Sequence, residues 1–407
     1  MLARRSKIKL FCDFRLIEQI MMKTESSSQL EKLKRTILES LCGDEWTEEQ
    51  VKMVRKLDKQ FEKGDFSLPD LRSEKVWAGT KFKNNCVSDL ISDIEHSRKF
   101  TFVHLNRKLL LKNYFTSSSA TFLANVDQPV CEAIVVNFDR DKPNSSELTS
   151  ARAERFSRCL ANLPLPRGVL VGVSSTDLSS QINSYAVVND KLNKVGIQVG
   201  AVIDEEKKKD VTTSLAEFTK RAYLAAKQLD DERCDPHEDC HSKQKRLETV
   251  VESSIQFNLL GSNITKPVQL VASNPNSNFV LYNSARVHQI LSSFEENPDY
   301  PKLPLAADID YGLLIETEEW ELYFNFLLPF SDVLLDCVAS SSLHKLVLFL
   351  VGLSNTFSRY FSRVKILREP LPHLIPTLHA RICLVHHLDR LLVNALNILN
   401  LKSVAKM

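Results

Sequence analysis

The sequence predicts an α/β region followed by a C-terminal bundle of α-helices. In the middle of the chain, short runs rich in β-branched residues alternate with helical patterns, which is typical of a mostly parallel sheet. After about residue 305 such runs disappear, and amphipathic segments follow one another. Apolar residues recur in these segments at steps of three and four, as in the buried seam of a helical bundle.

The chain divides into three regions on this basis. Residues 1–100 are expected to be mainly helical, because apolar residues in 28–66 recur at helical spacing between charges of both signs. Residues 101–304 form the predicted α/β domain, and residues 305–407 form the predicted helical bundle. The strands of the α/β domain are expected at 131–139, 168–175 and 194–204.

Composition limits the class of protein. A content of 43% apolar and 26% charged residues is ordinary for globular proteins, and a net charge of +2 indicates no particular partner. No apolar run approaches the roughly 20 residues that span a bilayer, so we expect no membrane partner. Nine scattered cysteines favour a reducing compartment, which predicts a cytoplasmic protein. The first residues, "MLARRSKIKLF", are basic, and a mitochondrial presequence is the alternative prediction for them.

Glycine is scarce, with ten residues in the whole chain. Loops that hold phosphate groups use glycine to bring the backbone close to the ligand. The sequence contains neither GxGxxG nor GxxxxGK[ST]. We therefore expect no cofactor.

One short segment combines thiol and imidazole side chains, which are both zinc ligands. Structural zinc sites usually join two separated pairs of ligands, and side chains this crowded can hardly all reach one tetrahedron. We prefer a polar loop, and whether the segment binds metal stays open. Its residues are Cys234, His237, Cys240 and His241.

Asp308 and Asp310 could act as a carboxylate pair in acid–base chemistry. No histidine, lysine or glycine-rich loop beside them completes a mechanism, so we expect an acidic connector. The sequence predicts no catalytic residues.

Charge is unevenly distributed near the C-terminus. Residues 307–336 contain eight Asp or Glu and no Lys or Arg, whereas residues 340–407 contain nine Lys or Arg against two acids. Lysine and arginine bind phosphates, and aromatic rings stack on unpaired RNA bases. The basic segment also contains aromatic residues, so it predicts an RNA-binding surface. A solvated basic face is the alternative.

Helical spacing separates the residues of "FSRYFSR". Phe357 and Tyr360 fall on the apolar seam and are expected to be buried, while Phe361 lies at its edge. Arg359 and Arg363, four residues apart, share the outward side. A second outward stripe is expected at His379, Cys383, His386 and Arg390.

The C-terminal segment resembles the DALR anticodon-binding domain of arginyl-tRNA synthetases. "FSRYF" at 357–361 is similar to the family's F-x-R-[FY]-[FY] stretch, and "ARICL" at 380–384 to its A-R-[LI]-x-L helix. Upstream, "YNSAR" at 282–286 resembles the Y-x-x-A-R helix that leads out of the synthetase catalytic domain. The resemblance implies a degenerate class I synthetase-like α/β domain followed by an all-α DALR bundle.

Two synthetase motifs are missing. His104 in "FVHLNRK" is solitary, so it does not form the histidine pair of a HIGH motif, and "KLNKVG" at 191–196 is not the KMSKS lysine motif. The resemblance therefore implies a protein that keeps a tRNA-binding domain but is not itself an enzyme.

The resemblance further implies a binder of the anticodon arm of arginine tRNA. It would be the accessory subunit of a tRNA 3-methylcytidine methyltransferase of the methyltransferase-like 2 type, which modifies position 32 of the anticodon loop. A protein-interaction scaffold without RNA binding and a residual arginyl-tRNA synthetase are the alternatives. Tyr282 and Arg286 would either hold the bundle against the α/β region or contact the tRNA. The other predicted tRNA contacts are Arg359, Tyr360, Phe361, Arg363, Lys365, Arg368, Arg381 and Arg390.

Overall fold

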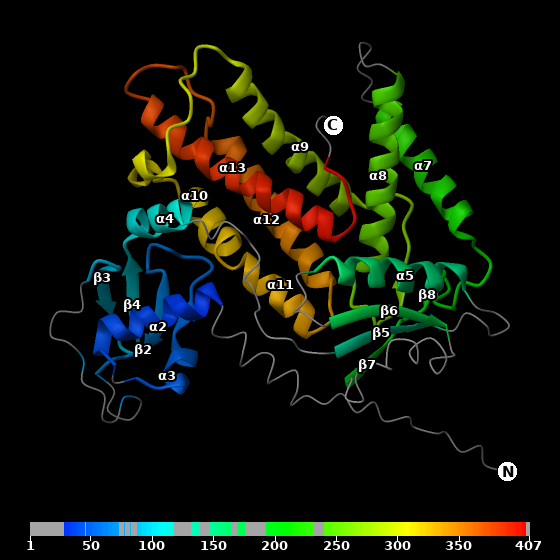
Figure 1. Ribbon diagram of the computed structural model, residues 1–407, viewed down its shortest axis with the longest axis horizontal. Coiled ribbons are helices and arrows are strands. Elements are labelled where there is room, and N and C mark those ends of the chain that lie inside the picture. The colour runs from blue at the N-terminus through cyan, green and yellow to red at the C-terminus, as the bar shows by residue number, and fades with distance from the viewer. Residues whose placement is uncertain are drawn as a thin grey trace.

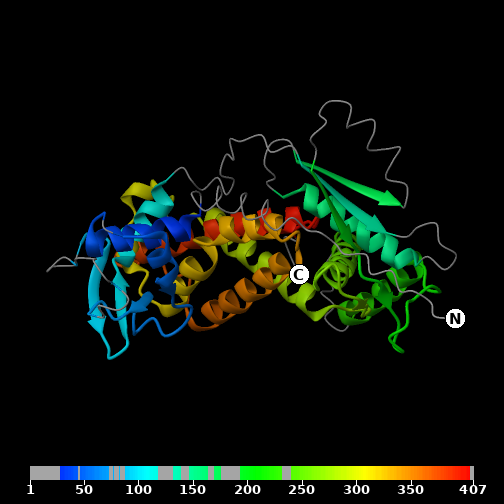
Figure 2. The same ribbon diagram turned by 90° about the horizontal axis from the view of Figure 1, so that it is seen from below.

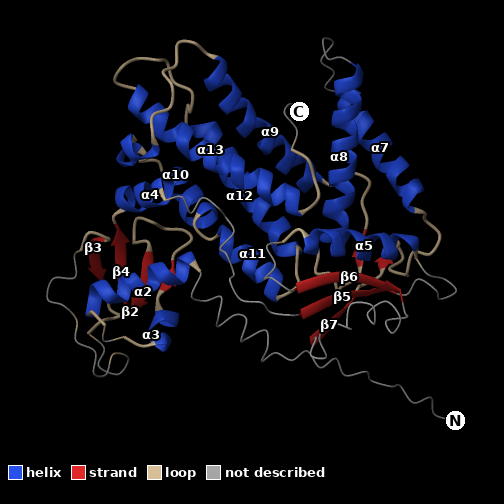
Figure 3. Cartoon of the chain, in the orientation of Figure 1, coloured by secondary structure: helices blue, strands red, loops and turns tan. Residues whose placement is uncertain are grey.

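The computed structural model describes three parts that follow one another along the long axis of the molecule. A mostly helical bundle lies in the middle, between an N-terminal unit and an α/β part (Figures 1 and 2). Strands are found only in the two outer parts of the described chain, as Figure 3 shows. The described residues are 28–44, 46–72, 77, 82, 88–117, 132–138, 146–163, 169–175, 193–231 and 240–403.

The N-terminal unit is a small sheet covered by helices. Its antiparallel strands have the order β1-β2-β4-β3, so the region expected to be mainly helical, residues 1–100, also contains a sheet that was not predicted. The strands are short, and β3 is mostly solvent-exposed, so they left no long apolar alternation in the sequence. The elements are α2 (Gln29–Cys42), α3 (Glu48–Met53), β1 (Arg55–Lys56), β2 (Phe66–Pro69), β3 (Ile91–His96), β4 (Phe100–Leu105) and α4 (Arg107–Thr116).

The α/β part contains a parallel sheet of order β6-β5-β7, as the alternation of strands and helices predicted. The third predicted strand is divided in two at Gly200, whose N–H donates to the carbonyl of Ile264 at 2.8 Å. A Cβ at Gly200 would lie 2.3 Å from the Lys266 carbonyl oxygen, so only glycine fits there. The elements are β5 (Glu132–Phe138), α5 (Glu147–Ala161), β6 (Val169–Ser175), β7 (Asn193–Gln198), β8 (Val202–Ile203), α7 (Leu215–Asp231), α8 (Cys240–Leu260) and β9 (Val268–Gln269).

Arg152 joins α5 to this turn. The side chain is fully buried and donates to the carbonyls of Leu259, Gly200 and Lys266 at 2.7–2.9 Å. Burial lowers the pKa of Arg152 to about 10. The guanidinium therefore cross-links chain segments that are far apart in the sequence.

The bundle begins earlier than the predicted boundary at residue 305. Helix α9 packs against α12 and α13 as well as against α8, so residues 275–296 belong with the bundle and border the α/β part. The amphipathic segments expected after residue 305 are confirmed as helices. The elements are α9 (Pro275–Glu296), η2 (Ala306–Asp308), η3 (Tyr311–Leu313), α10 (Thr317–Leu322), the π-turn η4 (Tyr323–Leu327), α11 (Phe330–Ala339), α12 (His344–Arg363) and α13 (Ile375–Ile398).

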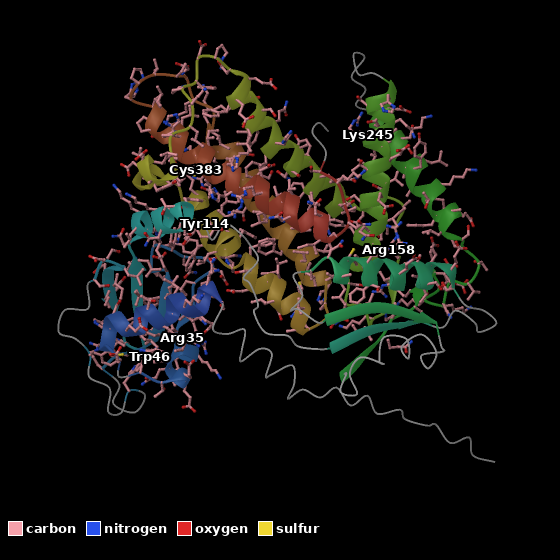
Figure 4. The ribbon with its side chains drawn as sticks, in the orientation of Figure 1. Arg35, Trp46, Tyr114, Arg158, Lys245 and Cys383 are labelled. Carbon is pink, nitrogen blue, oxygen red and sulfur yellow. The ribbon has the colours of Figure 1, made fainter. Side chains whose placement is uncertain are left out.

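The N-terminal unit packs directly on the bundle. The rings of Phe61 and Phe66 meet Phe324 edge-on, and Lys56 Nζ donates to Asn325 Oδ1 at 2.6 Å. Phe324 and Asn325 both lie in η4. The wider turn of a π-helix changes the direction in which its side chains point. Tyr114, labelled in Figure 4, donates from α4 to the carbonyl of Leu327 at 3.1 Å.

The helical stretch Thr317–Ala339 meets the length and composition of a membrane span, and no other helix in the described part of the chain does. Here the stretch has a core position, because Trp320, Tyr323 and Phe324 are buried between the N-terminal unit and the bundle. The same segment also contains Glu318 and Glu319. These contacts account for its apolar character.

Candidate nucleic-acid interface

The end of α12 follows the predicted helical phase. Phe357 and Tyr360 are buried in the bundle core, which confirms their place on the seam. Arg359, Phe361 and Arg363 are exposed. Helical spacing therefore correctly separated the core side of this helix from its solvent side.

A cation–π stack connects α9 to α12. The guanidinium of Arg286 lies 4.3 Å from the ring centre of Tyr282 and 4.2 Å from that of Phe361. Arg286 also donates to the hydroxyl of Tyr282. The residues Tyr282 and Phe361 remain 41% and 39% exposed, so the stack presents apolar surface beside a fixed cation. Tyr282 and Arg286 thus join two helices of the bundle to each other, instead of joining the bundle to the α/β part.

The acidic and basic segments of the sequence meet in space. Arg359 Nη2 donates to both carboxylate oxygens of Glu321 at 2.8 Å, and Arg363 pairs with Glu318. At the other end of α12, Lys345 pairs with Asp336 at 2.6 Å. Along the α10 side of α12 the basic residues are therefore balanced by acids, because the segments that differ in charge lie against each other.

Arg381 and Tyr360 were predicted to contact tRNA, and the structure places both in the core. Arg381 is 1% exposed and donates from Nε to Glu319 Oε1 at 2.7 Å. The Tyr360 hydroxyl donates to the same oxygen at 2.9 Å, and Arg381 Nη1 donates to the carbonyl of Lys365. Burial raises the pKa of Glu319, while the guanidinium and the hydroxyl act in the opposite direction. These residues hold α10, α12 and α13 together.

The remaining predicted contacts lie at the edges of the bundle. Lys365 is exposed and Arg368 half-buried, both in the segment that follows α12. Arg390 is exposed on α13. The expected outward stripe on α13 is interrupted at Cys383, which is buried with its thiol 3.4 Å from the hydroxyl of Tyr311.

The candidate chemistry of the sequence receives little support. Asp310 accepts the N–H of Gly312 and pairs with Lys108 at 3.0 Å, which holds the pKa of its carboxyl below the ordinary value. Within the described residues, no group of three or more histidine, cysteine or acidic side chains could hold a metal. Cys234 and His237 lie outside the described residues, as does the side chain of Cys240.

Sequence reasoning missed the acidic partners Glu318, Glu319 and Glu321. A signal was available in "ETEEWE" at 316–321, because its acids lie close together in one short helix, while the later helix α12 ends in basic residues. Spacing alone did not tell which arginine each acid would meet. The partners are separated by 38 to 62 positions along the chain.

The chain has two kinds of similarity to known proteins, and the first defines a class. Residues 280–407 match the family model of the DALR anticodon binding domain. The fold is similar to that of arginyl-tRNA synthetase from Plasmodium falciparum, with a TM-score of 0.60 at 11% identity, over 93% of this chain and 98% of that one. The protein therefore has an arginyl-tRNA synthetase-like fold with a C-terminal DALR domain.

The second similarity is to curated homologues named DALR anticodon-binding domain-containing protein 3. The chain is 34% identical to the Danio rerio protein over 185 residues, which are 40% of this chain and 33% of that protein. It is 39% identical to the Rattus norvegicus protein over 119 residues, which are 26% of this chain and 22% of that protein. The matches thus span a third or less of these relatives, whose name refers to the domain and not to a synthetase.

Proposed function

We propose that the protein binds tRNA through its C-terminal bundle, at the anticodon arm, without catalysing a reaction on it. The match of residues 280–407 to an anticodon-binding domain supports this proposal most directly. The exposed stack of Tyr282, Arg286 and Phe361 supports it physically, because RNA bases stack on flat rings and guanidiniums.

The proposal extends to arginine tRNAs and to a catalytic partner. The synthetase-like fold favours arginine tRNA as the substrate class. A methyltransferase of the methyltransferase-like 2 type would then form 3-methylcytidine on the bound tRNA. The sequence has no glycine-rich loop of the kind that holds a nucleotide or methyl donor, which supports a separate catalytic subunit.

Filter binding tests the RNA part of the proposal. The full chain is expected to bind arginine tRNA transcripts more tightly than other tRNAs of the same length. Arg286→Ala is expected to weaken binding, because it removes the cation and loosens both rings. Arg158→Ala is a matched control, since Arg158 is an exposed arginine on α5 in the α/β part (Figure 4). Equal binding of all tRNAs by both variants and the wild type would exclude a specific site at the stack.

Co-purification tests the partner. Co-purification of the methyltransferase with the full chain is measured with and without arginine tRNA. Arginine tRNA incubated with each protein alone, or with both, is then assayed for 3-methylcytidine. We expect formation of 3-methylcytidine to require both proteins. A scaffold that does not bind RNA would still co-purify with its partner but would show no tRNA-dependent effect.

A further inference from the structure

Two arginine–glutamate pairs form a ridge between α10 and the end of α12. We call Arg359–Glu321 and Arg363–Glu318 the paired ridge. The arginine side chains are 56% and 65% exposed, whereas the glutamate side chains are 14% and 4% exposed. Each pair therefore has its cation in solvent and its anion mostly inside the protein.

Each guanidinium keeps unused donors on its exposed side. Arg359 contacts both Glu321 and Thr356 through Nη2 alone. Arg363 contacts Glu318 through Nη1. Within the described part of the chain, Nε and the other terminal nitrogen of each guanidinium have no recorded hydrogen-bond partner. In Arg363 the free Nε and Nη2 lie on one edge of the guanidinium, so they can bind a phosphate in a bidentate manner, whereas the free Nε and Nη1 of Arg359 point to different sides and each offers a single hydrogen bond.

The pairs are expected to persist when a phosphate arrives. Glu318 is almost fully buried, and its second oxygen, Oε2, is buried without a hydrogen-bond partner. If Arg363 turned away toward a phosphate, Glu318 would remain a buried carboxylate without its counter-charge. That loss exceeds what one exposed ionic contact usually provides. The phosphate would therefore meet the pair and not a free arginine.

We infer that the paired ridge contacts the RNA backbone as neutral pairs, in which Glu318 and Glu321 orient the guanidiniums and limit their net charge. The inference rests on the proposed function and adds two positioning residues to it. A neutral pair releases few counterions but offers hydrogen bonds of fixed direction. The ridge would thus bind an RNA whose phosphates match the positions of these guanidiniums more tightly than it binds other polyanions.

The test is Glu318→Gln with Glu321→Gln in the full chain. Glutamine keeps the shape and an acceptor oxygen but removes both negative charges. Binding of an arginine tRNA transcript and of heparin is followed by fluorescence anisotropy over a range of salt concentrations. We expect tighter tRNA binding at low salt and a slope of log K against log salt that is steeper by roughly one to two units. Heparin is expected to gain more than tRNA, so their affinity ratio falls several-fold.

Asp336→Asn is the matched control. It removes a carboxylate from Lys345 at the opposite end of α12, so it changes net charge without touching the ridge. We expect its salt slope to equal that of the wild type. Equal steepening in this control would mean a general charge effect and would overturn the inference.

The remaining outcomes separate the inference from the proposed function. A wild type that binds tRNA, with salt slopes unchanged in the glutamine variant, would overturn the inference alone. A wild type that binds no tRNA would overturn both. If the double variant melts at a lower temperature, Glu321→Gln alone replaces it, because that side chain is the more exposed one. Its slope is expected to steepen by roughly one unit.

Discussion

Replacing Arg381 by methionine removes the cation from the buried cluster of Arg381, Glu319 and Tyr360. Glu319 is 0% exposed, so the substitution would leave a carboxylate in the core without its counter-charge. Breaking a buried ion pair in this way typically costs about 3–5 kcal/mol. The hydrogen bond from Tyr360 and the N–H of Glu316 remain, which places the expected loss near the lower end of that range.

Urea unfolding followed by tryptophan fluorescence measures this loss, because Trp320 lies on α10 beside the cluster. Lys365→Met is the control, since that side chain is exposed, and its effect is expected to stay within about 0.5 kcal/mol. Adding Glu319→Leu to Arg381→Met is expected to recover part of the stability, because both charges are then gone. Unchanged stability of Arg381→Met together with lost tRNA binding would refute the core assignment.

Three further predictions concern pH, stacking and docking. Burial lowers the pKa of His387 to about 4, below about 6.5 in the unfolded chain, so the imidazole is neutral in the fold. Unfolding then takes up a proton at low pH, and urea titrations should show a loss of about 2–3 kcal/mol between pH 7 and 4.5, with His387→Phe much less sensitive. Tyr282→Ala with Phe361→Ala should weaken tRNA binding in filter assays by about 1–3 kcal/mol for each base that stacks there; an unchanged affinity would exclude stacking. Lys56→Met removes the charged hydrogen bond to Asn325 and should destabilise the docked N-terminal unit by about 1.5–3 kcal/mol, seen as faster amide exchange in β2; unaltered exchange would contradict this.

The helices of the bundle could be predicted because their signal is local. The seam through Phe357 and Tyr360 repeats every three or four residues, and burial of such a stripe is enough to fix which side faces inward. The parallel strands were equally visible, since β5 and β6 are rich in β-branched residues. Regular, apolar elements therefore came directly from the sequence.

The N-terminal sheet could not be predicted in the same way. Strand β3 has one buried residue, Ile91, and one half-buried residue, Ile94, among exposed polar ones, so its pairing with β4 depends on tertiary contacts. The helical spacing predicted for residues 28–66 is confirmed in α2 and α3, but the prediction continued it past Met53, where α3 ends. Short edge strands leave few apolar positions to count.

The role of each arginine could not be predicted from spacing. Arg359 and Arg381 both belong to basic stretches, yet one lies on the surface and the other in the core. The difference comes from Glu321 and Glu319, which α10 places at different depths beside α12 and α13. Such partners become visible only once the helices are packed.

The most direct test of the account is competition between two RNA fragments for the full chain. An arginine tRNA anticodon stem-loop and an acceptor-stem hairpin of equal length are each titrated against a preformed complex with labelled arginine tRNA. We expect the anticodon stem-loop to displace the tRNA, and Arg286→Ala to reduce the affinity for this fragment while leaving any acceptor-stem binding unchanged. Displacement only by the acceptor-stem hairpin, or by neither fragment, would contradict binding of the anticodon arm by the bundle.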